Sequence, residues 1–523
     1  MSFSTTSKME KQTNPNIKAH LTRSAFCVLL VLLAVCMVPF VAAQRTGSKR
    51  IVTTVRSGSK ELVRVGNASP TNIIVVTNTN DSGAGSLRNA LAIANDGDTI
   101  DATGVSGTIL LTSGELQITH NVAINGPGAG SLAVNGNAAS RVFENFASDV
   151  TISGFTITNR LPPTGDNNGG GGILSHGGLT LIGTSILNNN AGGSFPPPNA
   201  GGGGIGISAG GTLSVIASII SGNENHQGPG GGISAGGTVT VSNSTINNNE
   251  GLCAAGGIVF DDIGGTLTVM NSTIIGNSVL GCPVSARAGW VLTGGGGIAS
   301  SGSVTVINST ISSNTVAEGG VFATGGGVAC SGIVTVNNST ISGNTVGGYM
   351  CKGGGINNGG NLTLTNSTLS GNSAPSGQGG AISNTGQTMI GDTVLNAGAS
   401  GGTIFNNGGT ITSLGYNIAS DSGGGVLTGP GDQINTDPML SPLQDNGGPT
   451  FTHALLPSSP AIDAGDPNFT PPPFYDQRGP GFPRVRNSRI DIGSFEVQAG
   501  STPTPTPRPT PAPRSRPTPA PRP

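Results

Sequence analysis

A short pattern recurs through most of this chain and restricts its fold more than any other feature. Each copy begins with a run of glycines and one apolar residue, continues with alternating apolar and polar residues, and closes near an Asn. Successive copies lie 25 to 40 residues apart, a spacing typical of repeat proteins whose units bury their apolar faces only against neighbouring units. The apolar residues that follow the glycine runs are Ile173, Ile205, Ile233, Ile258, Ile298, Val328, Ile356 and Ile382.

The middle of each copy has the period-2 alternation of a β-strand, as in Thr238-Val239-Thr240-Val241. Such a strand is too short to bury a face alone, but stacked copies pair their strands about 4.8 Å apart and line a common core. Leucine-rich repeats are the rival solenoid, but the Leu-rich motif they require is absent from this sequence. A second apolar column supports the stacked arrangement: Ile186, Ile220, Ile246, Ile274, Ile311, Ile341, Leu369 and Val394.

An Asn stands three residues after most members of this second column, and Ala397 takes its place in the last copy. Stacked Asn side chains form hydrogen-bonded ladders in other cross-strand arrays. We therefore predict a structural Asn ladder at one turn of the coil. Its members are Asn189, Asn223, Asn249, Asn277, Asn314, Asn344 and Asn372.

With these columns in place, residues 71–430 resemble the right-handed parallel β-helix superfamily, which includes pectate-lyase-like proteins and polymorphic outer-membrane repeats. The resemblance implies an all-β, right-handed parallel β-helix solenoid. Residues 81–100 are similar to the start of many secreted bacterial β-helix proteins. There, Ser86 is expected to cap a short helix over residues 87–94, which would cover the open end of the first coil.

A different block follows the repeats at residues 431–498. It contains the segments Asn446-Gly447-Gly448-Pro449-Thr450, Ser459-Pro460-Ala461-Ile462-Asp463-Ala464-Gly465 and Asp491-Ile492-Gly493. These segments resemble the choice-of-anchor Q domain found after secreted β-helices, which implies an irregular C-terminal domain. Residues 499–523 form a Pro/Thr/Arg-rich tail that we expect to be disordered and extended, acting as a solvated linker. Association with the cell envelope through its arginines is the alternative.

The N-terminus has the organisation of a signal peptide over residues 1–43. Lysines and an arginine precede an apolar run at residues 25–38, and Ala42-Ala43 supplies small residues for cleavage. An uncleaved anchor is the alternative. Residues 44–70 are expected to be a flexible segment. We therefore predict export to the extracellular space or the cell surface, associated with an outer membrane.

Four cysteines follow residue 43, and an exported chain permits disulfides. No CxxC pair is present, so a zinc site is not predicted. The candidate disulfide residues are Cys253, Cys282, Cys330 and Cys351, with the first two and the last two as the hypothesised pairs.

Motifs of pectin-active enzymes are incomplete. Asp261-Asp262 and Asn435-Thr436-Asp437 stand in reversed order, and His176 lies in Ser-His-Gly-Gly instead of the Gly-His-Gly of polygalacturonase-like enzymes. Adjacent Asp residues in a strand would point to opposite faces. Between residues 161 and 450, eleven acidic residues are scattered and only Arg287 and Lys352 are basic. We predict no catalytic, cofactor-binding or metal-binding residues.

The coils differ in length because the segment between the Asn column and the next glycine run varies. Solenoids place such insertions on one face, which often binds partners. We predict a contact patch in these loops, formed by Arg287, Trp290, Phe322 and Tyr349, with packing at the loop bases as the alternative. The expected function is an exported, non-enzymatic β-helix for adhesion or envelope structure. Its expected partner is an unidentified surface or polysaccharide, with no nucleic acid and no cofactor. The alternative is a polysaccharide lyase or glycoside hydrolase of the pectin-active β-helix type.

Overall fold

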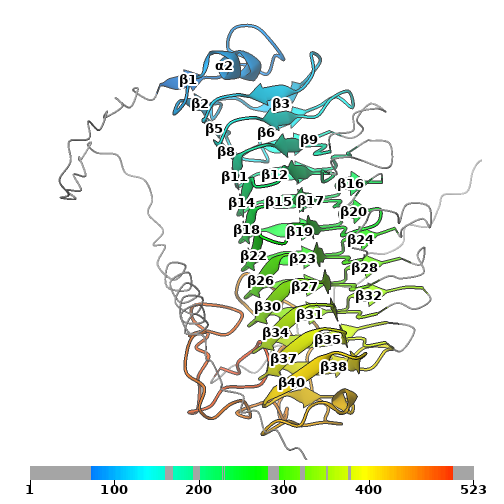
Figure 1. Cartoon of the computed structure of the whole chain (residues 1–523). Helices are drawn as coiled ribbons and strands as arrows, with labels where there is room; N and C mark the ends of the chain where they lie inside the picture. Colours follow the sequence, from blue (N-terminus) through cyan, green and yellow to red (C-terminus); the bar gives the residue numbers. More distant parts are fainter. Residues whose placement is uncertain are drawn as a thin grey trace, which may run out of the picture. The chain divides into compact units, whose positions relative to one another are not determined.

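The computed structural model describes residues 72–159, 169–191, 201–226, 228, 230–280, 294–317, 324–348, 352–374 and 378–498. These residues belong to one compact unit, and their strands stack in parallel, coil upon coil (Figure 1). The predicted class, an all-β parallel β-helix, is confirmed. The segments predicted as signal peptide, flexible linker and C-terminal tail lie outside the described residues.

Sheet A is the longest of the four sheets in the described part of the chain, with 13 strands. It contains the alternating segments of the repeat. Its strands, in spatial order, are β1 (Ile73–Val75), β2 (Thr99–Asp101), β5 (Ala123–Asn125), β8 (Asp149–Ser153), β11 (Gly178–Ile182), β14 (Thr212–Ile216), β18 (Thr238–Ser242), β22 (Thr266–Met270), β26 (Ser303–Ile307), β30 (Ile333–Asn337), β34 (Asn361–Thr365), β37 (Gln387–Gly391) and β40 (Thr410–Gly415).

Sheet B follows sheet A in each coil and carries the second apolar column. Its strands are β3 (Gly107–Leu110), β6 (Leu132–Asn135), β9 (Thr156–Thr158), β12 (Ser185–Leu187), β15 (Ile219–Ser221), β19 (Thr245–Asn247), β23 (Thr273–Ile275), β27 (Thr310–Ser312), β31 (Thr340–Ser342), β35 (Thr368–Asn372), β38 (Val394–Ala397) and β41 (Ile418–Ala419).

In sheet C, each strand from β10 to β36 begins at the apolar residue that follows a glycine run of the repeat. Its strands are β4 (Leu116–Ile118), β7 (Phe143–Asn145), β10 (Ile173–Ser175), β13 (Ile205–Ile207), β17 (Ile233–Ala235), β21 (Ile258–Phe260), β25 (Ile298–Ser300), β29 (Val328–Cys330), β33 (Ile356–Asn358), β36 (Ile382–Asn384) and β39 (Ile404–Asn406). The short sheet D contains β16 (Glu224–Asn225), β20 (Glu250–Gly251), β24 (Ser278–Val279), β28 (Thr315–Val316) and β32 (Thr345–Val346).

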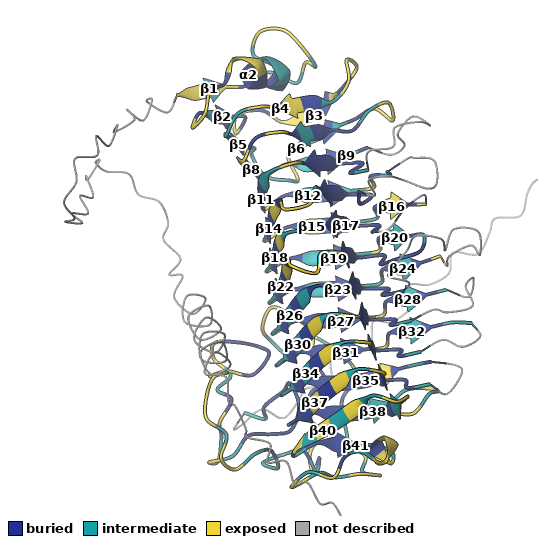
Figure 2. Cartoon of the chain, viewed as in Figure 1, coloured by how far each residue is buried: buried dark blue, intermediate teal, exposed yellow. Residues whose placement is uncertain are grey.

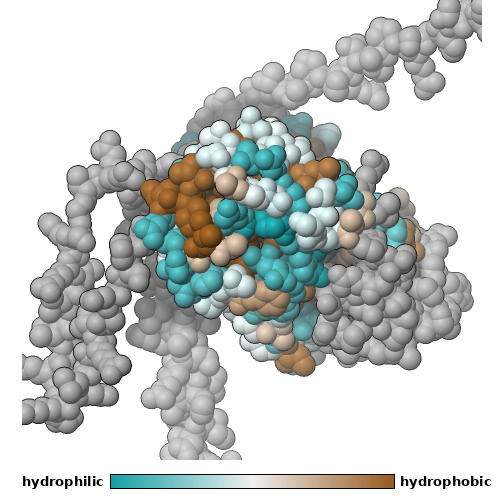
Figure 3. Space-filling model, turned by 90° about the horizontal axis from the view of Figure 1, so that it is seen from above, coloured by the Kyte–Doolittle hydropathy of each residue, from teal (hydrophilic) through white to brown (hydrophobic). Residues whose placement is uncertain are grey.

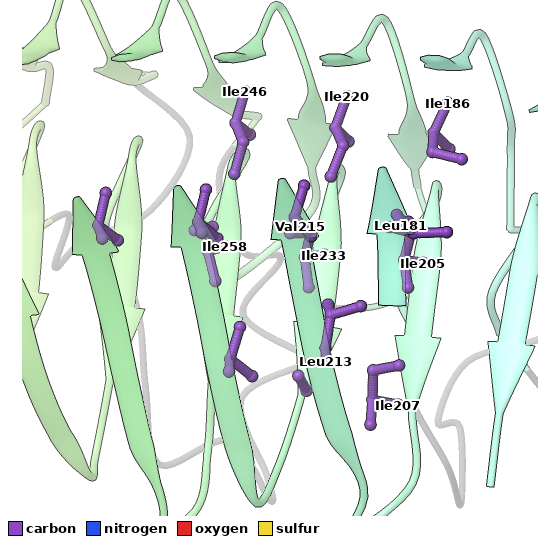
Figure 4. Packing of buried hydrophobic residues seen from close by; sticks show 14 of the residues in the cluster. Leu181, Ile186, Ile205, Ile207, Leu213, Val215, Ile220, Ile233, Ile246 and Ile258 are labelled. Atoms are coloured by element: carbon purple, nitrogen blue, oxygen red, sulfur yellow. The ribbon is translucent and has the colours of Figure 1, made fainter. Parts of the chain in front are cut away.

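The core is the inside of the coil, where each sheet contributes alternate side chains. In β18, for example, Val239 and Val241 are buried whereas Thr238 is exposed. Figure 4 shows Ile186, Ile220 and Ile246 stacked in one row that points into this interior, and Figure 2 shows buried residues along the whole stack. Burial of one such side chain stabilises the fold by about 1.5–3 kcal/mol, and the repeat adds several per coil.

The N-terminal end is closed by a helix, as predicted. Helix α2 (Leu87–Ile93) begins after Ser86, whose side chain accepts a hydrogen bond from the backbone N–H of Asn89. Leu87 and Leu91 are buried in the main core, so the helix covers the apolar end of the first coil (Figure 1). In the part of the chain that the structure describes, no helix has the length and apolar character needed to cross a bilayer.

The block at residues 431–498, here called the C-terminal block, contains no strand or helix among its described residues, only isolated bridges. A 3-10 turn, η2 (Gly423–Gly425), precedes it. The block packs on the outer face of sheet B. Thr310 of β27 donates to the carbonyl of Phe451 at 2.6 Å, and Ser342 of β31 hydrogen-bonds His453 at 2.9 Å. The outward-facing residues of β27 and β31 are consequently buried, although their counterparts in β19 and β23 are partly exposed.

Candidate functional site

A polar cluster lies on the outer face of sheet C in the N-terminal coils. Register explains how it forms: Leu116, Phe143, Ile173 and Ile205 stand side by side in β4, β7, β10 and β13. His176 and Ser208 follow their strands at matching positions and stack, whereas Glu144 lies within β7 and Glu115 and Arg141 precede β4 and β7. The cluster consists of Glu115, Arg141, Glu144, His176 and Ser208.

Arg141 forms ion pairs with both glutamates of the cluster. Its side chain is only 5% exposed, and its Nη1 lies 3.0 Å from Oε2 of Glu115 and 3.6 Å from Oε1 of Glu144. Its Nε donates to the carbonyl of Gly170 in the next coil at 3.1 Å. A buried guanidinium needs such partners, because an unpaired charge is expensive to desolvate.

Glu144 is held as a carboxylate. Burial acts to raise its pKa, but hydrogen bonds with Glu115 and His176 and the charge of Arg141 outweigh burial and lower the pKa. A carboxylate with a lowered pKa is a stable hydrogen-bond acceptor at neutral pH.

His176 bridges two coils. Its Nδ1 lies 2.9 Å from Oγ of Ser208, and its Nε2 lies 3.2 Å from Oε1 of Glu144. Its ring stacks on Phe146, with 5.1 Å between ring centroids and 18° between ring planes. The Phe146 side chain is 50% exposed, so this stack presents an aromatic surface to solvent.

A hollow of about 640 Å³ adjoins the cluster beside helix α2. Arg88 and Arg141 line it together with Glu115, Gln117 and Thr119. Arg88 is fixed there, since its Nη2 pairs with Oδ1 of Asp81 at 2.7 Å and its Nη1 donates to the carbonyl of Glu115. Seen from above, this end of the molecule mixes hydrophilic and hydrophobic side chains (Figure 3).

The seven Asn residues predicted as a ladder are stacked in the interior of the turn and all are buried. The Nδ2 of Asn249, for example, donates to Oδ1 of Asn277 at 2.9 Å, and its backbone N–H donates to the same oxygen at 3.0 Å. The same Nδ2 contact recurs at 2.8–2.9 Å along the column. The column begins at Asn189, whose Oδ1 is buried and has no hydrogen-bond partner among the residues that the structure describes.

The predicted disulfide at Cys330 is wrong, because Cys330 is a free, buried thiol. It is the last residue of β29, and its side chain packs in the main core, 4% exposed, instead of facing the loops. Its Sγ donates to Oδ1 of Asn358 at 3.4 Å, and burial raises its pKa to about 12. Cys253 is disulfide-bonded, whereas Cys282 and Cys351 lie outside the described residues.

The four residues of the predicted contact patch also lie outside the described residues: Arg287, Trp290, Phe322 and Tyr349. The strands that lead into their loops are in register. Val279, Val316 and Val346 of β24, β28 and β32 pair side by side and pack into a small buried cluster of their own. Sheet D follows the edge of the stack opposite sheet A (Figure 1).

Sequence reasoning missed the N-terminal cluster because it sought charged groups only beyond residue 160. Part of the signal was present as spacing, since His176 and Ser208 are 32 residues apart, which is the step between the paired residues Ile173 and Ile205. Glu144 lies two residues before the position that matches His176, because the preceding coil, from Phe143 to Ile173, has 30 residues. Among the described residues, no group of three or more His, Cys, Asp or Glu side chains is arranged to hold a metal ion.

The comparison with protein families agrees with this architecture. A family model described as a right handed beta helix region matches residues 141–302, so the solenoid is a right-handed parallel β-helix. A crystal structure of pectate lyase Pel9A is similar with a TM-score of 0.43 and 16% sequence identity, covering 83% of this chain and 98% of that chain. No curated protein matches the sequence.

Proposed function

We propose that this chain is an exported surface or extracellular β-helix that binds a polysaccharide, in adhesion or envelope structure, without cleaving its glycosidic bonds. The observation that carries the proposal is the hollow of about 640 Å³ that Arg88, Arg141, Glu115 and Gln117 line. The exposed Phe146 follows the neighbouring strand, where its backbone N–H donates to the carbonyl of Ile118, between the lining residues Gln117 and Thr119. Charged and amide groups fix the orientation of sugar hydroxyls, and an aromatic face packs against a sugar ring.

The support for export is the organisation of residues 1–43 and the resemblance of residues 431–498 to an anchoring domain. The C-terminal block fits a structural role at the end of a surface stalk, because its polar side chains are engaged with sheet B. Gln477, for example, donates to Thr310 of β27 at 2.9 Å and accepts from Thr340 of β31 at 2.6 Å.

Cleavage of a glycosidic bond is the alternative, and the carboxylates of Glu115 and Glu144 are its best support. Glycosidases place two carboxyl groups about 5–10 Å apart so that the bond fits between them. Here the two groups contact one nitrogen of Arg141, at 3.0 Å and 3.6 Å. A glycosidase needs one of its two carboxyl groups to donate a proton, and a carboxylate paired with a guanidinium is a poor proton donor, which weighs against the alternative.

The test is binding of the secreted full chain to a panel of polysaccharides. Phe146→Ala and Gln117→Ala are expected to weaken binding to the selected glycan at least tenfold. Ile182→Ala is the control, because Ile182 is a similarly exposed apolar residue on sheet A. Equal loss in all three variants, or release of reducing sugars or unsaturated uronides, would contradict the proposal.

The predicted loop patch remains a second contact surface to test in the same assay. Trp290→Ala should weaken binding if the loops hold the glycan, whereas loss confined to Phe146→Ala places the ligand in the N-terminal hollow. A chain lacking residues 499–523 tests the tail separately: cell fractionation should show it released if the tail attaches the protein to the envelope.

A further inference from the structure

We propose that Ser208, His176 and Glu144 form a nucleophile, a general base and an orienting carboxylate that hydrolyse short acyl esters carried by a saccharide. This activity goes beyond binding, and it leaves glycosidic bonds intact. The three residues are joined by hydrogen bonds of 2.9 Å and 3.2 Å through the two ring nitrogens of His176.

The hydrogen bonds define one proton arrangement. Because Glu144 is a carboxylate, it accepts from Nε2 of His176, and this leaves Nδ1 as the acceptor for the Ser208 hydroxyl. That is the arrangement in which a serine hydroxyl can lose its proton to the ring while a carboxylate stabilises the imidazolium that forms.

Each member is held by contacts outside the relay. Arg141 pairs with Glu144, Phe146 stacks on the His176 ring, and the backbone N–H of Ser208 donates to Ser175 at 2.9 Å. All three members lie in or directly after strands of sheet C, which are rigid supports for a catalytic group. The His176 side chain is 38% exposed and Ser208 is half-buried, so a substrate on the surface can reach both.

Two backbone N–H groups that can stabilise a developing oxyanion belong to Ala209 and Gly210, the residues directly after Ser208 in the chain. The Ser208 carbonyl accepts from the N–H of Gly211 at 3.0 Å, which closes a turn around Ala209 and Gly210. Among the hydrogen bonds of the described residues, the N–H groups of Ala209 and Gly210 have no acceptor, and both residues are exposed. Backbone N–H groups of this kind stabilise the negative charge of a tetrahedral intermediate.

The reaction consumes only the ester and one water molecule, and it yields an alcohol and a carboxylic acid. Oγ of Ser208 attacks the ester carbonyl carbon while its proton passes to Nδ1 of His176. The bond to the alcohol oxygen then breaks, and His176 returns the proton to that oxygen. Water, deprotonated by His176, attacks the acyl-serine, releases a carboxylic acid and restores the hydroxyl. The partners of Ser208 are polar, and the Phe146 ring lies against His176, which favours a short acyl group on a polyhydroxylated alcohol.

The experiment uses the secreted full chain with p-nitrophenyl acetate as substrate and a fluorophosphonate as active-site probe. The wild-type chain should hydrolyse the ester, and mass spectrometry should locate the probe on Ser208. Ser208→Ala and His176→Asn should each lower hydrolysis by about 100-fold or more and abolish labelling, as removal of a member of such a relay does elsewhere. Glu144→Gln should lower hydrolysis while retaining the shape of the side chain.

Ser214→Ala is the matched control, because Ser214 is half-buried in the next strand of the same coil, on sheet A. If Ser208→Ala does not fold, His176→Asn decides the question. Labelling spread over several serines, or hydrolysis unchanged in Ser208→Ala or His176→Asn, overturns the proposal. Glycan binding by Ser208→Ala is measured in parallel, so failure of the ester activity is distinguishable from failure of polysaccharide binding.

Discussion

Thr340 and Gln477 stand 137 positions apart in the chain, and the Thr340 hydroxyl donates a 2.6 Å hydrogen bond to the side-chain carbonyl of Gln477. Gln477 is fully buried between sheet B and the C-terminal block, and its Nε2 also donates to Thr310 and Thr450 at 2.9 Å. One amide therefore joins two strands of the solenoid to the block that follows it.

Gln477→Ala should consequently weaken the docking of the block on sheet B, which the hydrogen bonds of Thr310 with Phe451 and of Ser342 with His453 continue to hold. The substitution removes the hydrogen bonds that Gln477 makes with the buried hydroxyls of Thr310, Thr340 and Thr450, although each of these keeps a second partner. We expect a loss of about 2–4 kcal/mol in the free energy of unfolding, because several buried hydrogen bonds are lost together. Chemical denaturation measures this loss. Gln387→Ala removes an exposed amide from β37 and should cost less than about 0.5 kcal/mol. Equal effects of the two substitutions would contradict the role given to Gln477.

Asn277→Ala should break the Asn ladder in the middle of the stack. The Nδ2 of Asn277 donates to Oδ1 of Asn314 and to the carbonyl of Ile246, and all of these groups are buried. We expect destabilisation of about 2–4 kcal/mol, since the substitution removes a side chain bonded to the coils on both sides. Asn361→Ala, an exposed Asn at the start of β34, is the control. A ladder variant as stable as this control would show that the stacked amides add nothing.

Glu496 should make the protein less stable as pH rises. Burial raises the pKa of its carboxyl to about 9, with Arg484 opposing the shift and Asp491 and Asp476 adding to it. A raised folded-state pKa means that its contribution is fully present below the usual value of 4.5 and declines until about pH 9. Glu496→Gln should therefore reduce the difference in denaturation midpoint between pH 5.5 and pH 8. An unchanged difference would exclude Glu496 as its source.

Cys330 should react only after unfolding. Its thiol is buried and its pKa is raised to about 12, so the reactive thiolate is scarce at neutral pH. Alkylation followed by mass spectrometry should modify Cys330 in denaturant without a reductant, whereas Cys253 should need reduction first. A disulfide-linked peptide that contains Cys330 would refute the assignment.

The local pattern of residues was enough to predict most of the solenoid. Val239 and Val241 alternate with threonines, which determines which side chains face the core once coils stack. The cap at Ser86 was also predictable, because an N-cap is a local interaction within one turn of helix. The column of seven asparagines could be located for the same reason, since each repeats at one position of the coil.

Other features depend on how distant coils meet. The sequence pattern does not predict that the side chain of Cys330 faces the core. In the structure Cys330 is the last residue of β29, and its side chain packs in the main core instead of in the loops. The docking of the C-terminal block on β27 and β31 was not predictable either, because its residues carry no period that matches the strands they cover.

The sequence by itself thus determined the strands, the core columns and the ladder, because these follow from short-range periodicity and burial. Only the tertiary structure decided that Glu144, His176 and Ser208 meet, and that Gln477 joins the block to sheet B. Coil lengths differ along the chain, so neighbours across coils depend on the register of every intervening strand. That register is set by packing of the whole stack and not by any one segment.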